Sequence, residues 1–132
     1  MPHLQFEINF SVSQAEKVAF AASVKDRFAQ IMDTGTDHTA VTIRCYDADD
    51  LSFGTANDAG EAIAFVNADI RAGRTAEQKR ELSVALIEDL FQLWKVPRSN
   101  VYVVLTEHAG NEFHLHDRVL PTWSEGDDPL GA

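Results

Sequence analysis

Residues 62–79 read AIAFVNADIRAGRTAEQK, and this stretch decides the fold. A mostly apolar run ends at Ile70, a short basic turn follows around Gly73, and a polar segment comes next. A near-continuous apolar run of this length predicts a strand in the interior of a sheet. Thr75 followed by Gln78 forms a capping box, in which the two side chains satisfy backbone N–H groups of a first helical turn. The stretch therefore predicts a strand, a turn and a helix.

The turn carries two arginines, Arg71 and Arg74. Guanidinium groups beside the free N–H groups and the positive dipole end of a helix are suited to binding a carboxylate. The plainer interpretation of the same residues is a solvated basic turn.

The whole unit occurs twice, because residues 2–46 align without a gap with residues 64–108. A second capping box, Ser13 to Glu16, falls on the first one. Apolar residues also coincide along one face of each helix. These stripes are Phe20, Val24, Phe28 and Ile31 in the first copy and Leu82, Leu86, Leu90 and Leu93 in the second. The chain is therefore predicted to be a tandem β-α-β repeat.

We expect strands at about residues 3–10, 38–46, 62–71 and 100–107, and helices at about 13–33 and 76–94. A further short strand could lie within residues 108–121. Strands joined by a crossover helix run parallel, so the predicted fold is α+β, with a four-stranded sheet and both helices on one face. Residues 1–123 are expected to form a single domain, and residues 124–132 an acidic flexible tail.

The net charge of the chain limits the kinds of partner that it is expected to bind. The formal charge of −10, from 21 acidic and 11 basic side chains, argues against nucleic acid and against an anionic membrane surface. No apolar run approaches the ~20 residues of a membrane span, and the N-terminus has no signal pattern. The single cysteine, Cys45, stands in an apolar strand and is expected to be a buried, inert thiol. A cytoplasmic location is expected.

The outward positions of the last predicted strand include Tyr102 and Val104. Two helices can cover only one face of the sheet, so these apolar groups need another partner. We therefore expect the chain to form an oligomer.

Three parts of the chain resemble the tautomerase superfamily: the start Met1-Pro2-His3, the Ala64-Phe65-Val66 strand, and residues 71–79. The first two, together with the Gly73-Arg74 turn, are similar to 5-carboxymethyl-2-hydroxymuconate isomerase. The spacing of Arg71 and Arg74, with the sequence RVLP at 118–121, is similar to the cis-3-chloroacrylic acid dehalogenase branch. The resemblance implies a cofactor-free enzyme, two fused β-α-β units and a homotrimer.

The resemblance also implies roles for particular residues. Removal of Met1 would leave Pro2 with a secondary amine, whose pKa is about 8 when unperturbed. Apolar surroundings and two nearby arginines would lower that pKa and leave a general base at neutral pH. Arg71 and Arg74 would bind the substrate carboxylate and stabilise the developing enolate. Weaker candidates for substrate contact are Glu112, Tyr102, Arg118 and Asp37, the last near an acidic residue of the malonate semialdehyde decarboxylases.

The chain departs from the dehalogenase pattern at two positions. Leu115 stands where that branch has its water-activating glutamate, and Val104 where it has a helper tyrosine. Neither side chain can position water, although Glu112, Tyr102 and His114 are close enough in sequence to keep hydration open. His114 and His116 could bind a metal with Glu112 and Asp117, but no third ligand has convincing spacing, and no metal is expected.

Three classes of function follow. The first is an isomerase that shifts a proton within a small 2-keto or 2-hydroxydienoate acid. The second is a decarboxylase, dehalogenase or hydratase of small β-keto or unsaturated acids. The third is a non-catalytic binding trimer, favoured if Met1 is retained.

Overall fold

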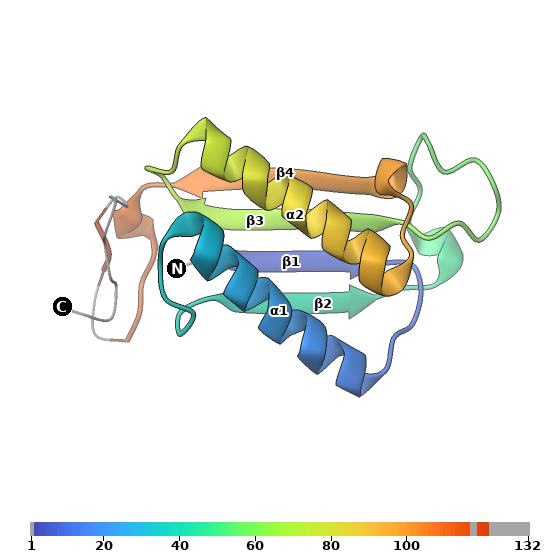
Figure 1. Cartoon of the computed structure of the whole chain (residues 1–132), viewed down its shortest axis with the longest axis horizontal. Helices are drawn as coiled ribbons and strands as arrows, with labels where there is room; N and C mark the ends of the chain where they lie inside the picture. Colours follow the sequence, from blue (N-terminus) through green and yellow to red (C-terminus); the bar gives the residue numbers. More distant parts are fainter. Residues whose placement is uncertain (1, 117–118, 122–132) are drawn as a thin grey trace.

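A computed structural model describes residues 2–116 and 119–121 of the chain. Its principal elements follow the order predicted from the repeat (Figure 1). They are β1 (His3–Ile8), α1 (Gln14–Met32), β2 (Ala40–Cys45), β3 (Ala64–Arg71), α2 (Ala76–Trp94) and β4 (Val101–His108). Short 3-10 turns are η1 (Ala48–Asp50), η2 (Arg98–Asn100) and η3 (Gly110–Glu112). The predicted tandem β-α-β architecture is confirmed for the described residues.

The strands form a mixed sheet in the order β2-β1-β3-β4. Each half contributes a parallel pair, β1 with β2 and β3 with β4, and the halves meet where β1 and β3 run antiparallel. In that antiparallel pair His3 lies opposite Asp69, and Ile8 lies opposite Ala64. The start of β1 therefore lies beside the end of β3, at the left of the sheet in Figure 1. The interior position predicted for β3 is confirmed.

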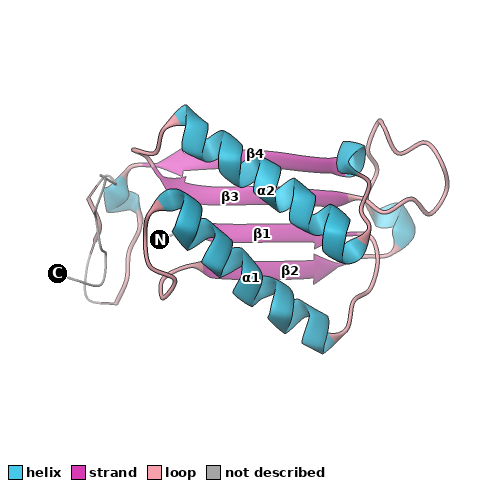
Figure 2. Ribbon diagram, viewed as in Figure 1, coloured by secondary structure: helices cyan, strands magenta, loops and turns pink. Residues whose placement is uncertain are grey.

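Both helices cover the same face of the sheet (Figure 2). Each begins at its predicted capping box, where the Ser13 and Thr75 side chains accept hydrogen bonds from the backbone N–H groups of Glu16 and Gln78. The buried residues of the helix stripes are Phe20, Val24, Phe28 and Met32 on α1 and Leu82, Leu86 and Leu90 on α2.

The prediction is wrong for one residue of the α2 stripe. Leu93 is 54% exposed, and the neighbouring Trp94 covers the core in the last turn of α2 instead. The Trp94 ring centroid lies 4.2 Å from that of Phe20 and 6.2 Å from that of Phe10. The large indole ring reaches the core from the edge of the helix face, and this leaves Leu93 outside.

The loops shorten the predicted strands. β2 begins at Ala40 rather than 38, because the preceding residues form a turn closed by a hydrogen bond from Thr39 N to Thr36 O (3.1 Å). In the described part of residues 108–121 the predicted further strand is reduced to an isolated bridge between His114 and Val119. Cys45 is half-buried and packs against the core.

The other face of the sheet carries the outward side chains of all four described strands. Tyr102 is 51% and Val104 39% exposed there, as the alternation of the sequence predicts. Neither α1 nor α2 is long and apolar enough to cross a bilayer. The residues beyond position 121, including the predicted tail, lie outside the described part of the chain.

Candidate active site

Pro2 lies at the edge of the core, immediately before β1. It is buried, and its carbonyl oxygen accepts a hydrogen bond from Ala40 N (3.0 Å). Extending the β1–β3 register by one residue brings Pro2 opposite Ile70, so that Arg71 is the next residue along β3. The N-terminal nitrogen of a chain that begins at Pro2 would therefore lie at the end of the sheet where β3 stops.

The two arginines are buried at this same end. Arg71, the last residue of β3, is 1% exposed, and Arg74 is 6% exposed. Gly73 between them has φ +128°, a conformation that glycine adopts without strain and that turns the chain towards α2. The Arg74 guanidinium carbon lies 5.9 Å from the centroid of the Phe28 ring, within the range of a cation–π contact. The solvated basic turn, the plainer interpretation of these residues, is therefore wrong.

A C-terminal segment covers Arg71. The Nη1 atom of Arg71 donates a hydrogen bond to the carbonyl oxygen of Pro121 (2.8 Å). A Cβ atom added to Gly110 would lie 2.1 Å from that same carbonyl group, so only glycine allows the segment to pass this close. The end of the described chain therefore forms one wall of the site.

A polar cluster adjoins Arg71 on the open face of the sheet. His108, the partner of Arg71 in the β3–β4 register, has its Nε2 atom 3.2 Å from Asp69 Oδ1 and its Nδ1 atom 3.7 Å from Glu112 Oε2. The Gln5 amide donates to the second Asp69 oxygen (3.1 Å). The cluster offers proton-exchanging groups within one strand spacing of Arg71.

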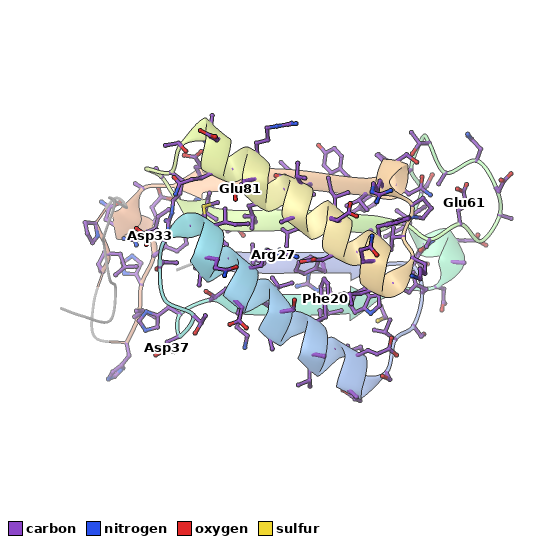
Figure 3. The ribbon with its side chains drawn as sticks, viewed as in Figure 1. Phe20, Arg27, Asp33, Asp37, Glu61 and Glu81 are labelled. Carbon is purple, nitrogen blue, oxygen red and sulfur yellow. The ribbon has the colours of Figure 1, made fainter. Side chains whose placement is uncertain are left out.

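The weaker sequence candidates separate into two groups. Glu112 in η3 joins the site end through His108, and Asp37 is exposed on the loop before β2 at the same end (Figure 3). Tyr102 pairs with Phe65 at the start of β3, six residues from Arg71, which is about 20 Å of extended strand. Within one chain it does not join the site. Arg118 lies outside the described residues.

Sequence reasoning missed three residues at this end: Asp69, His108 and Thr39. The first two are outward polar positions of β3 and β4, and the alternation of the strands could have identified them. Thr39 aligns with Val101 in the second copy. The presence of a polar residue at a position that is apolar in the second copy could have identified Thr39.

A hollow lies on the open face of the sheet, away from the arginines. Its volume is about 430 Å³, and its walls include the aromatic rings of Phe53, Phe65 and Tyr102. It lies near the start of β3, and no arginine lines it among the described residues. The described histidine, cysteine, aspartate and glutamate residues nowhere gather in a group of three that could hold a metal ion.

Comparison with known proteins finds a family match in the second half of the chain and a shared fold over most of it. Residues 65–122 match the family model described as tautomerase enzyme. A fused 4-OT, solved as a symmetric trimer, is 25% identical, with a TM-score of 0.77 over 89% of this chain and 94% of that one. A search of curated proteins found no match.

Two further solved structures share the fold. A member of the cis-3-chloroacrylic acid dehalogenase family is 21% identical, with a TM-score of 0.76 over 89% of this chain and 84% of that one. The FG41 malonate semialdehyde decarboxylase is 19% identical, with a TM-score of 0.69 over 84% of this chain and 86% of that one. The second half of the chain therefore matches the tautomerase family in sequence, and the chain as a whole shares the fold of tautomerase-superfamily structures.

Proposed function

We propose that this chain is a cofactor-free tautomerase that moves a proton within a small enolisable 2-keto or 2-hydroxydienoate acid. The observation that carries the proposal is the burial of Arg71 and Arg74, 1% and 6% exposed, at the sheet end where the chain starts. A guanidinium group held in place by its surroundings can bind a carboxylate through paired, charge-assisted hydrogen bonds. Two such groups at one end of the sheet therefore favour a small anionic substrate.

The proposed reaction uses Pro2 and the two arginines in consecutive steps. The neutral amine of Pro2 removes a proton from the carbon next to the substrate carbonyl. The C–H electron pair moves towards the carbonyl oxygen and forms an enolate. Arg71 and Arg74 bind the carboxylate of the substrate and stabilise this enolate. The ammonium form of Pro2 then returns the proton to another atom of the substrate. Acid–base catalysis by a single positioned group typically contributes ~10²–10⁴ in rate.

The test compares proton exchange with hydrolysis. In D₂O, NMR should show exchange at the α-carbon of a 2-keto acid such as phenylpyruvate, and a chloride assay should detect negligible halide release from 3-chloroacrylates. Hydration is disfavoured because Leu115 and Val104 stand where the similar dehalogenase branch has its water-activating glutamate and helper tyrosine. Rapid halide release without α-proton exchange would contradict the proposal.

A hydratase or dehalogenase is the second candidate, and one observation favours it. Glu112 reaches this end of the sheet and contacts His108. If halide release is found, Glu112→Gln should abolish it, since this carboxylate would then be the water-activating group. A decarboxylase using Asp37 is the remaining enzymatic alternative, and release of CO₂ from malonate semialdehyde tests it.

The proposed base exists only if Met1 is removed. The initiator methionine is normally removable when a small residue such as proline follows it, so the intact mass of untagged protein should fall short of the full translation by one methionine. An unprocessed protein would instead favour the non-catalytic binding trimer.

We also propose a homotrimer. Fused 4-OT structures are described as symmetric and asymmetric trimers, and the open face of this sheet exposes Tyr102 and Val104 beside an aromatic hollow. Contact between copies would cover these apolar groups. Sedimentation equilibrium should give three times the chain mass, and a stable, fully folded monomer at micromolar concentration would rule the trimer out.

A further inference from the structure

The hydroxyl group of Thr39 is buried without a hydrogen-bond partner among the described residues. Thr39 is 8% exposed. Buried hydroxyl groups are almost always bonded, because a donor or acceptor taken out of water without a replacement is unfavourable. An orphaned hydroxyl in a native fold therefore indicates a partner that is missing in this form of the chain.

Two independent registers put Thr39 beside Pro2. In the first half, His3 pairs with Ala40, so the preceding residues Pro2 and Thr39 are the next pair, and Ala40 N bonds the Pro2 carbonyl. The second half repeats the arrangement as an observed pair, Ala64 with Val101. These residues align with Pro2 and Thr39 in the repeat.

The side chains of this pair share the helix-facing side of the sheet. Strand side chains alternate between the two faces, and Thr39 stands in phase with Val41, which packs against the core, while Ala40 between them is exposed. Pro2 stands in phase with the buried Leu4. The hydroxyl of Thr39 and the ring of Pro2 therefore meet in the same buried layer.

The missing partner follows from the chemistry of Pro2. While Met1 is attached, the nitrogen of Pro2 is a tertiary amide with no hydrogen to donate. Removal of Met1 turns it into a secondary amine, which has one N–H when neutral and two when protonated. We propose that Thr39 is a positioning residue for Pro2, with its hydroxyl oxygen accepting a hydrogen bond from the amine of the processed chain.

The catalytic part of this inference rests on the proposed tautomerase function. With its one N–H held by Thr39, the neutral amine directs its lone pair away from the core. When that lone pair takes the substrate proton, a new N–H bond forms as the C–H bond breaks, and the ammonium keeps the first N–H on Thr39. Only the second proton is then free to return to the substrate.

The experiment measures melting temperatures in two forms of the full chain. One form is processed to Pro2, as checked by intact mass, and the other carries several residues ahead of Met1, so that the nitrogen of Pro2 stays an amide. Thr39→Val copies the valine of the second half and removes only the hydroxyl. It should lower the Tm of the processed form by about 3–5 °C, the effect of one lost hydrogen bond. In the extended form it should leave the Tm unchanged or raise it.

Thr42→Val is the matched control. The Thr42 hydroxyl lies 2.7 Å from His3 Nε2, a contact independent of Met1, so this substitution should change the Tm equally in both forms. An equal effect of Thr39→Val in both forms would overturn the inference, whatever the activity.

Enzyme kinetics tests whether the hydrogen bond between Thr39 and Pro2 also contributes to catalysis. Thr39→Val should reduce kcat by up to about a hundredfold with little change in KM, because it disturbs the orientation of the base and leaves carboxylate binding intact. Thr39→Ser should restore most of the rate. If the form-dependent Tm shift is found but the processed wild type exchanges no substrate proton, the contact stands and the proposed function fails. If the Tm shift is found and Thr39→Val leaves kcat unchanged, the positioning role is overturned.

Discussion

The two halves of the chain share one fold but differ at equivalent turns. In the alignment of residues 2–46 with 64–108, Asn9, just after β1, corresponds to Arg71, the last residue of β3. Asn9 is 6% exposed and fully engaged by the backbone around it. Its amide donates to Glu61 O (3.0 Å) and Ala48 O (3.2 Å), and its carbonyl accepts from Ile63 N (2.8 Å). In the first half, this position holds the connector between the halves.

The second half uses the same position for a buried cation. Arg71 ends β3 at the end of the sheet where Pro2 lies, and its guanidinium donates a hydrogen bond to the carbonyl of Pro121. Where the first half has the connector passing into Ala64, the second half has the start of the described chain at Pro2. One end of the sheet is therefore closed by the connector, and at the other end Pro2 lies next to a buried cation.

The repeat gives the fold an approximate twofold symmetry, and the two helices contact each other close to its axis. Arg27 on α1 and Asp89 on α2 are equivalent positions of the repeat, and they form an ion pair with an Nε–Oδ2 distance of 3.1 Å. Figure 3 shows Arg27 at the middle of the helix pair. Residues at equivalent positions near a twofold axis face each other, so opposite charges there join the two copies.

The largest expected effect is loss of the N-terminal base. Pro2→Ala gives the first half the residue that stands at the equivalent position of the second, Ala64. The primary amine it leaves is a less rigid base, and we expect kcat/KM for α-proton exchange to fall by about 10²–10⁴. The oligomeric state should be unchanged in sedimentation. An unaltered rate would remove Pro2 from the mechanism.

Next in size is the removal of either buried arginine. Arg71→Ala or Arg74→Ala should lower kcat/KM by roughly tenfold to a thousandfold, the ~1.5–4 kcal/mol expected for losing a charged hydrogen bond to a developing anion. Steady-state kinetics on phenylpyruvate measures this effect. If the variants exchange the substrate proton at the wild-type rate, the two arginines have a structural role and not a catalytic one.

The equivalent change in the first half should act on stability alone. Asn9→Ala leaves the buried Ile63 N–H and two carbonyl groups without their partner, so we expect the free energy of unfolding to fall by about 2–4 kcal/mol. Urea unfolding should show a lower midpoint at a similar slope. At temperatures where the variant is folded, its kcat/KM should match the wild type, and a large loss there would mean that both ends of the sheet serve the reaction.

A charge exchange tests the pseudo-symmetric ion pair. Arg27→Asp places two carboxylates together and should reduce stability by about 1–3 kcal/mol. The double variant Arg27→Asp with Asp89→Arg should recover most of that loss, because the two positions are equivalent in the repeat. A double-mutant cycle from chemical unfolding measures the coupling. No recovery would show that the surroundings of the two positions differ more than the backbone does.

The smallest effect concerns a pair present only in the second half. Arg98 bonds both oxygens of Glu88 (2.8 Å each) and is the main cause that lowers the pKa of Glu88 to about 2. The first half has Asp26 and Thr36 at these positions, which cannot form an ion pair. Because the folded pKa is depressed, the pair stabilises the fold above the unfolded value near 4.3 and loses that contribution as the pH falls towards 2.

Arg98→Ala should therefore raise the titration midpoint of Glu88 in NMR and cause a small loss of stability at pH 7 that shrinks with acidification. Both side chains are about half exposed, so screening by solvent and salt keeps the effect small. A stability difference that grows as the pH falls would contradict this account.

Much of the fold was predictable from local pattern. The capping boxes at Ser13 and Thr75 set the helix starts, and the alternation in β1 and β3 sorted the inward residues, because both signals depend on near neighbours in the chain. Leu93 was mispredicted, since periodicity does not reveal that Trp94 reaches Phe20. Arg71 and Arg74 were found as candidates from their turn, but His108 and Thr39 were not.

The sequence by itself determined the repeat, the order of strands and helices, and the residue types available for chemistry. The tertiary structure alone decided that the halves pair antiparallel through β1 and β3, and this pairing brings the start of the chain to the end of β3. It also decided that the guanidinium of Arg71 is buried under Pro121 and that Thr39 lies in register with Pro2. Such neighbours are separated by tens of residues along the chain, and only strand register and side-chain packing bring them together.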